Sequence, residues 1–137
     1  ISYDSSRGTF FQCSYGDGAG GGPTRLLHRY TARMASQEAI AFNSGAAATA
    51  LNALADADST LFYVASLDAF FYWTSGAVLY KITPNAGTTW DVETVTITGD
   101  TLPTASHAHS RACWVESLGG MAYLPNDTGN LYFVRLV

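Results

Sequence analysis

Residues 61–73 read LFYVASLDAFFYW, and two other stretches align with them without a gap: ISYDSSRGTFFQC at 1–13 and ACWVESLGGMAYL at 112–124. In each stretch an apolar run leads through a short turn of small or polar residues into a second apolar run. Runs this rich in aromatic and β-branched residues are typical of strands, and a pair of them around a tight turn is typical of a hairpin. The alignment therefore predicts three equivalent antiparallel hairpins in a repeated structure.

The columns of this alignment predict which residues occupy matching places. The matched sets are Tyr3, Tyr63 and Trp114; Ser6, Ser66 and Ser117; and Phe10, Phe70 and Met121. We expect the hairpins to turn near Ser5–Gly8, Leu67–Ala69 and Leu118–Gly120. Gly8, Gly119 and Gly120 supply the backbone freedom that a tight turn with positive φ requires.

A third strand follows each hairpin, with the sequences LLHRYT at 26–31, VLYKIT at 78–83 and LYFVRL at 131–136. In these strands Leu27, Leu79 and Leu131 match, and beside them lie His28, Tyr80 and Tyr132. A fourth strand is expected at Trp90–Thr98 in the middle copy and at QEAIAF, residues 37–42, in the first. The alanine-rich segment 44–59 has little periodic amphipathicity, so we expect a loop there that contains at most a helical turn.

This arrangement resembles kelch-type and galactose-oxidase-like β-propeller repeats. The similarity lies in the turn SLGG at 117–120, in the third strand that precedes Trp90, and in the linker LPTASHAHSRACWV at 102–115. The double glycine of the kelch pattern is present only as Gly119-Gly120. The resemblance implies an all-β fold of antiparallel four-stranded blade repeats.

The whole chain, 1–137, is then a single partial β-propeller region. We expect blades at about 1–58 and 59–104 and a partial C-terminal blade at 105–137. Closed propellers have roughly four to eight blades, so such a chain needs further polypeptide to complete it. The opening on Ile1, inside a strand-like pattern, leads us to expect a processed product.

Composition excludes several classes of protein. The 137 residues are 47% hydrophobic and 13% charged, which is typical of a chain with a packed core and not of a disordered one. The net charge of −4 argues against nucleic-acid binding, which normally uses clustered Lys and Arg. No stretch approaches the ~18 uninterrupted apolar residues of a membrane span.

Few residues point to chemistry. His107 and His109 are two apart and would face the same way on a strand, which makes them weak candidates for metal ligands. No third ligand is fixed beside them, so we expect them to line a loop between blades, with no metal, no cofactor and no catalytic residue. The glycine-rich stretch 16–22 lacks the Lys and Ser/Thr of a phosphate-binding loop and predicts an expanded hairpin loop.

The remaining candidates are equally sparse. Asp56 and Asp58 predict a solvated loop and not an acid–base pair. Cys13 and Cys113 are expected to be buried thiols, with a disulfide as the less favoured alternative. Asn126 begins a glycosylation acceptor pattern, Asn-Asp-Thr.

The sequence thus favours a non-catalytic binding or structural module that assembles with other protein chains or with the rest of its own precursor. Carbohydrate is a further candidate ligand, because aromatic residues are plentiful. An extracellular or virion-associated location is weakly favoured. The alternative is a fragment of a carbohydrate-active or galactose-oxidase-like propeller enzyme, which would need acids or metal ligands that converge at one end of the blade axis.

Overall fold

A computed structural model describes residues 1–16, 24–30, 37–54, 59–74, 76–100, 102, 111–125 and 129–136. The strands in these parts of the chain are β1 (Ser2–Asp4), β2 (Thr9–Gly16), β3 (Thr24–Tyr30), β4 (Gln37–Phe42), β5 (Thr60–Val64), β6 (Ala69–Trp73), β7 (Val78–Thr83), β8 (Thr89–Thr96), β9 (Ala112–Val115), β10 (Gly120–Tyr123) and β11 (Tyr132–Arg135). A short helix α1 spans Ala46–Asn52, and two 3-10 turns span Ala65–Leu67 (η1) and Glu116–Leu118 (η2). Neither α1 nor any other described helix is long and apolar enough to cross a membrane.

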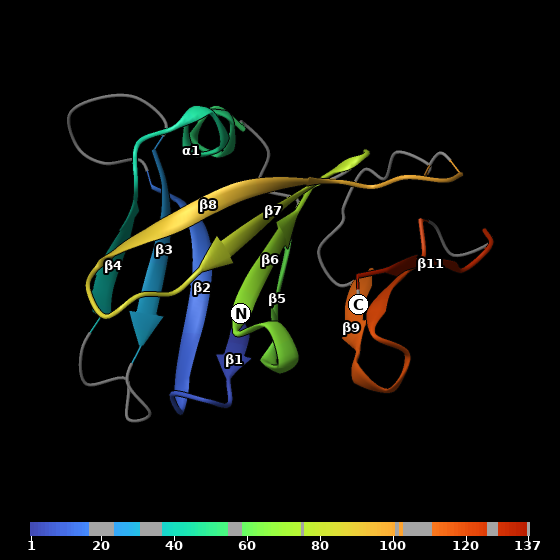
Figure 1. Cartoon of the computed structure of the whole chain (residues 1–137), viewed down its shortest axis with the longest axis horizontal. Coiled ribbons are helices and arrows are strands. Elements are labelled where there is room, and N and C mark those ends of the chain that lie inside the picture. The colour runs from blue at the N-terminus through green and yellow to red at the C-terminus, as the bar shows by residue number, and fades with distance from the viewer. Residues whose placement is uncertain are drawn as a thin grey trace.

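The strands follow one another in three antiparallel meanders. The first meander is β1 to β4, the second is β5 to β8, and the third is β9 to β11. The first two are joined edge to edge, because β4 and β8 pair in parallel. The result is one eight-stranded sheet in the order β1-β2-β3-β4-β8-β7-β6-β5. Since β1 also contacts β5, this sheet is nearly closed and barrel-like, and the third meander lies beside it (Figure 1).

The all-β prediction is confirmed, but the first two meanders are not the separate four-stranded blades that we expected. The first two meanders end on β4 and β8, and the outer edge of such a strand carries unpaired backbone N–H and C=O groups that can pair with another strand. Here the two edges satisfy each other. The Ala41 N–H donates to the Thr88 carbonyl at 2.8 Å, and the Asn43 N–H donates to the Trp90 carbonyl at 2.9 Å.

The three hairpins share one pairing register. Residues matched by the alignment pair with matched residues across each first hairpin: Tyr3 with Phe10, Tyr63 with Phe70 and Trp114 with Met121. The same holds between the second and third strands: Gln12 with His28, Tyr72 with Tyr80 and Tyr123 with Tyr132. The prediction of equivalent hairpins is therefore confirmed at the level of strand register.

The hairpin turns also match, and they lie close to where the sequence placed them. Gly8, Asp68 and Gly119 occupy one column of the alignment and have φ values of 64°, 44° and 63°. A left-handed residue at this point closes each turn, and glycine adopts that conformation without the steric cost that a Cβ brings. The second turn uses Asp68 instead, which is one of the few other residue types that tolerate this conformation.

Two hydrophobic clusters hold the three meanders in a stack. The first cluster lies between the first and second meanders and consists of Phe11, Leu27, Ile40, Leu51, Tyr63, Phe70, Tyr72, Tyr80, Ile82 and Trp90. The second lies between the second and third meanders and consists of Phe62, Val64, Ala69, Phe71, Trp73, Leu79, Leu102, Met121, Tyr123 and Val134. Successive residues of a strand face opposite sides, so β6 contributes to both clusters and all five of its residues are buried.

We expected the alanine-rich segment 44–59 to be a loop with at most a helical turn. It contains the seven-residue helix α1, which is longer than a single turn. Alanine and leucine favour helix intrinsically, and Leu51 anchors this one because its side chain is fully buried in the first cluster. The helix contacts β3 and β8 and covers one end of the eight-stranded sheet (Figure 1). Nearby, the Trp90 indole N–H donates to the Gly87 carbonyl at 2.9 Å, which satisfies the polar atom of a fully buried ring.

Candidate functional site

The sequence candidates for chemistry fall mostly outside the described residues. His107 and His109 lie there, as do Asp56, Asp58, Asn126 and most of the glycine-rich stretch. Within the part of the chain that the structure describes, no group of three or more His, Cys, Asp or Glu side chains is placed to hold a metal ion. The structure therefore offers no position for the histidine pair.

The two cysteines differ from what we expected. Cys13 is half-buried and Cys113 is exposed, and neither takes part in a disulfide. The expectation of two buried thiols was therefore wrong for Cys113. It lies on β9, and its strand-like surroundings do not bury it.

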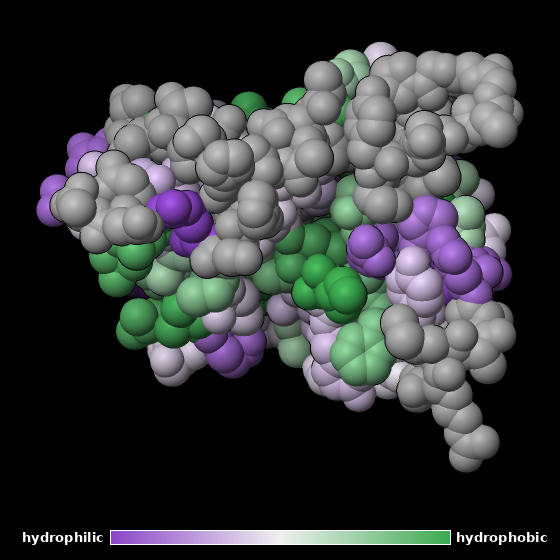
Figure 2. All heavy atoms as spheres, turned by 180° about the vertical axis from the view of Figure 1, so that it is seen from behind, coloured by the Kyte–Doolittle hydropathy of each residue, from purple (hydrophilic) through white to green (hydrophobic). Residues whose placement is uncertain are grey.

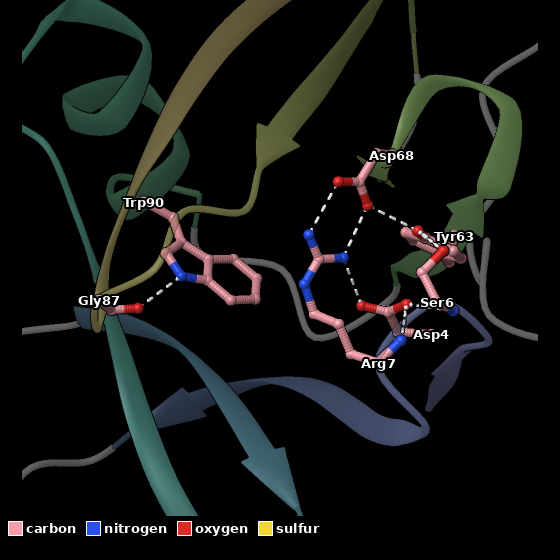
Figure 3. Close-up of polar contacts among 7 residues, drawn as sticks. All are labelled: Asp4, Ser6, Arg7, Tyr63, Asp68, Gly87 and Trp90. Carbon is pink, nitrogen blue, oxygen red and sulfur yellow. Dashed lines mark hydrogen bonds and ion pairs between the residues drawn. The ribbon is translucent and has the colours of Figure 1, made fainter.

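A polar cluster joins the turns of the first two meanders, and the sequence did not reveal it (Figure 3). Its centre is Arg7, which forms a two-pronged ion pair with Asp68: Nη1 lies 2.6 Å from Oδ1, and Nη2 lies 2.8 Å from Oδ2. Arg7 Nη1 also lies 2.8 Å from Oδ2 of Asp4, which is fully buried. The other oxygen of Asp4 accepts hydrogen bonds from the backbone N–H groups of Ser6 and Arg7. The buried carboxylate thus has the partners that a buried charge requires.

A hydrogen-bond chain extends the cluster to β5. The Tyr63 hydroxyl lies 2.7 Å from Asp68 Oδ1 and 2.8 Å from Ser6 Oγ. A phenol has a single proton, so Tyr63 donates to the carboxylate and Ser6 donates to the phenolic oxygen. Ser6 and Tyr63 belong to two of the matched columns, and the contact joins consecutive meanders.

The electrostatics of the cluster make it a structural clamp. The hydrogen bonds from Arg7, together with a smaller effect of the bond from Tyr63, lower the pKa of Asp68 from its ordinary 3.8 to about 2. The hydrogen bonds to Asp68 raise the pKa of Arg7, and burial raises the pKa of Tyr63. At neutral pH Arg7, Tyr63 and Asp68 therefore keep their ordinary charge states, and none of the three is poised to exchange a proton.

A groove lies beside the first strands of the three meanders. It has a volume of about 520 Å³ and runs along β1, β5 and β9, which contact one another in that order. Its lining residues are Ile1, Ser2, Tyr3, Ser59, Thr60, Leu61, Phe62, Tyr63, Ala112, Cys113 and Trp114. Its lining combines the aromatic residues Tyr3, Phe62 and Trp114 with the hydroxyl-bearing residues Ser2, Ser59 and Thr60, so it offers both ring surfaces and polar contacts.

The second cavity has a volume of about 560 Å³ and lies between the end of β8 and β11. It is lined by Val95–Thr98, Asp100, Leu102 and Leu131–Leu136. In the first two meanders a fourth strand, β4 or β8, covers the third strand. In the described part of the third meander β11 has β10 as its only partner strand, and the cavity lies along its other side.

Both ends of the stack expose a largely apolar sheet face. The N-face is the outer side of the first meander and comprises Ile1, Tyr3, Phe10, Gln12, His28 and Tyr30. The C-face is the outer side of the third meander and comprises Cys113, Val115, Ala122, Leu131, Phe133 and Arg135. On the N-face Ile1 is 80% exposed and Tyr3 51%, and on the C-face Leu131 is 70% exposed and Phe133 44%. Seen from behind, apolar side chains reach the surface at the centre of the molecule and over its β9–β11 side (Figure 2).

The N-face is internally ordered. The rings of Tyr3 and Phe10 pack with their centroids 4.9 Å apart. Farther along the sheet the Tyr30 hydroxyl lies 3.4 Å from the side-chain carbonyl of Gln12, and the Gln37 amide lies 2.7 Å from His28 Nδ1. On this face the aromatic pair and the hydrogen-bonded polar groups restrict one another, so few of its side chains are free to rotate.

No protein-family model matches the chain, and neither a curated protein nor a solved structure is significantly similar to it.

Proposed function

We propose that the chain is a non-catalytic module of the β-propeller type that assembles with further polypeptide through the N-face and the C-face. The observation that carries the proposal is the exposure of both faces. In the interior of the stack, each meander covers its neighbour with apolar side chains. At the two ends the residues of the same kind meet solvent, and soluble monomers rarely expose large contiguous patches of this type.

Repeat architecture supports this proposal. Each repeat unit buries its core only against a neighbour, so the outermost units need either a polar outer face or another partner. The kelch-like pattern of the sequence and the common register of the three hairpins are consistent with this kind of repeat. The parallel pairing of β4 with β8 distinguishes the isolated chain from a row of separate blades.

The cavity beside β11 adds support of a different kind. It lies where the fourth strand would lie if the third meander were built like the first two. Apolar side chains of Leu102, Val95 and Leu136 border it. A strand of further polypeptide would cover these groups and would satisfy the open backbone edge of β11.

Sedimentation velocity of the purified chain across the micromolar range tests the proposal. We expect a folded protein that self-associates, and we expect polar substitutions on the open faces, such as Leu131→Gln, to reduce that association. The control is Thr94→Gln on β8, where the side chain is exposed but outside both faces. A cooperatively folded chain that stays monomeric at every concentration would contradict the proposal.

A further inference from the structure

We infer that the partner of the open faces is a second copy of this chain, whose C-face packs on the N-face of the first. This inference rests on the proposed function and specifies the partner. The junction between two copies would continue the stack in the way that consecutive meanders already continue it. In a two-fold pair both junctions form at once, and no open face remains.

The C-face has the same positions as a face that is already buried. Its residues match Phe62, Val64, Phe71, Leu79, Lys81 and Thr83 of the second meander, by the alignment and the shared register. Of these, all except Lys81 and Thr83 belong to the second cluster, where they pack against the third meander. The C-face therefore presents, at the end of the stack, the side of a meander that elsewhere packs against the next one.

The N-face has the complementary positions. Its residues match Leu61, Tyr63, Phe70, Tyr72, Tyr80 and Ile82 of the second meander. All of these lie in or against the first cluster, where they pack on the first meander. The C-face thus corresponds to the side of a meander that packs on the following meander. The N-face corresponds to the side that packs on the preceding meander. Two like faces would not bring together the two sides of a meander that meet at the internal junctions, whereas a head-to-tail contact would.

Ser117 and Tyr3 supply a specific polar contact for this junction. Between the first two meanders, Ser6 hydrogen-bonds the Tyr63 hydroxyl at 2.8 Å. Ser117 matches Ser6 and is exposed on the turn of the third meander. Tyr3 matches Tyr63, and its hydroxyl points to its own turn, where it would lie 4.0 Å from a Cβ built on Gly8. In a head-to-tail pair the Ser117 hydroxyl of one copy meets the Tyr3 hydroxyl of the other.

The number of meanders favours a pair over a longer assembly. Each copy contributes three meanders, so a closed pair contains six, within the roughly four to eight units of closed propellers. Three copies would exceed that range. A head-to-tail contact that did not close would instead produce open chains of copies.

The test is a complementation experiment in the full chain. Phe133→Glu places a charge on the C-face, and Phe10→Glu places one on the N-face. Each variant alone should associate at least about tenfold more weakly than the unaltered chain, because a buried aromatic anchor is lost. An equimolar mixture should regain association that neither variant shows alone, since an intact C-face then meets an intact N-face. Leu131→Glu replaces Phe133→Glu if circular dichroism shows that the latter is unfolded.

Cys113 provides a second readout that needs no substitution. Its match, Phe62, is 7% exposed between the second and third meanders, so pairing should bury Cys113 in the same way. We expect its rate of alkylation by a maleimide to fall several-fold as protein concentration rises through the association midpoint. Association that one face variant abolishes and the other leaves intact, with no recovery on mixing, would overturn the head-to-tail inference but not the proposed function. A chain that is folded and monomeric throughout would overturn both.

Discussion

Asp68 should make the stability of the chain depend on acid, and replacement of Asp68 by Asn should remove that dependence. Arg7 holds the pKa of Asp68 at about 2, below its ordinary 3.8. A carboxyl group whose pKa is lowered on folding stabilises the folded state above its unfolded pKa. That contribution is lost as pH falls from about 4 to about 2. Asn keeps the shape of Asp68 and tolerates its left-handed φ of 44°, so the turn survives the substitution.

The exposure of Asp68 limits the size of the effect. The full pKa shift would correspond to roughly 2.5 kcal/mol by linkage. The Asp68 side chain is 55% exposed, however, so solvent screening reduces the expected contribution to about 1 kcal/mol or less. Arg7→Gln should cost more, about 2–3 kcal/mol, because it leaves the fully buried carboxylate of Asp4 without its cationic partner.

Urea unfolding at pH 7, 4 and 2 measures these quantities. The unaltered chain should lose up to about 1 kcal/mol more between pH 4 and pH 2 than Asp68→Asn loses. Asp68→Gly is the matched control, because glycine occupies the same place at Gly8 and Gly119; it should show the same shallow dependence as Asp68→Asn. Identical pH profiles for the unaltered chain and Asp68→Asn, or an Arg7→Gln variant no less stable than Asp68→Asn, would refute the clamp.

Three further predictions test the stack. Phe70→Ala should destabilise the monomer by about 3–5 kcal/mol in urea unfolding, because Phe70 is fully buried. Phe10→Ala at the matching, exposed position should cost about 1 kcal/mol or less. Equal costs would contradict the placement of Phe70 inside the stack and of Phe10 on its outer face. Gly120→Ala should cost about 1–3 kcal/mol in the same assay, since a Cβ there would lie 2.4 Å from the Phe133 ring. Gly87→Ala, where a Cβ meets only ordinary contacts, is its control, and a neutral Gly120→Ala would contradict the close approach of β11. Leu51→Ala should lower the thermal midpoint by several degrees, in line with a cost of about 2–5 kcal/mol, and should remove the helical contribution of α1 to circular dichroism.

The sequence predicted the hairpins well because their determinants are local. An apolar run, a turn and a second apolar run fix both the strands and their register, since a slip of one residue would exchange the two faces. For this reason the matched columns of Tyr3, Tyr63 and Trp114 reappear as matched pairs in the structure. The third strands followed from the same alternation.

The contacts between meanders could not be predicted in the same way. The pairing of β4 with β8 joins segments far apart in the chain and depends on which edges the stack brings together. The ion pair of Arg7 with Asp68 spans 61 positions. One signal could have revealed it: a carboxylate stands in the second copy where Gly8 and Gly119 stand in the others. A charged residue in a glycine column indicates a local role for its side chain, and here that role is to bind Arg7.

Burial at matched positions is decided by place in the stack and not by residue type. Phe10 and Phe70 occupy one column and have the same side chain, yet Phe10 is 38% exposed and Phe70 is fully buried. A repeat unit that ends a stack in a monomeric protein normally carries a polar outer face, which keeps it soluble. At the N-face the most exposed positions hold Ile1, Tyr3 and Phe10, beside the polar Gln12 and His28, so the end unit keeps much of the apolar pattern of an interior one. At the other end Leu131 and Phe133 keep the same pattern. The proposed pairing of two copies accounts for these exposed side chains, because each end face would be covered by the other copy.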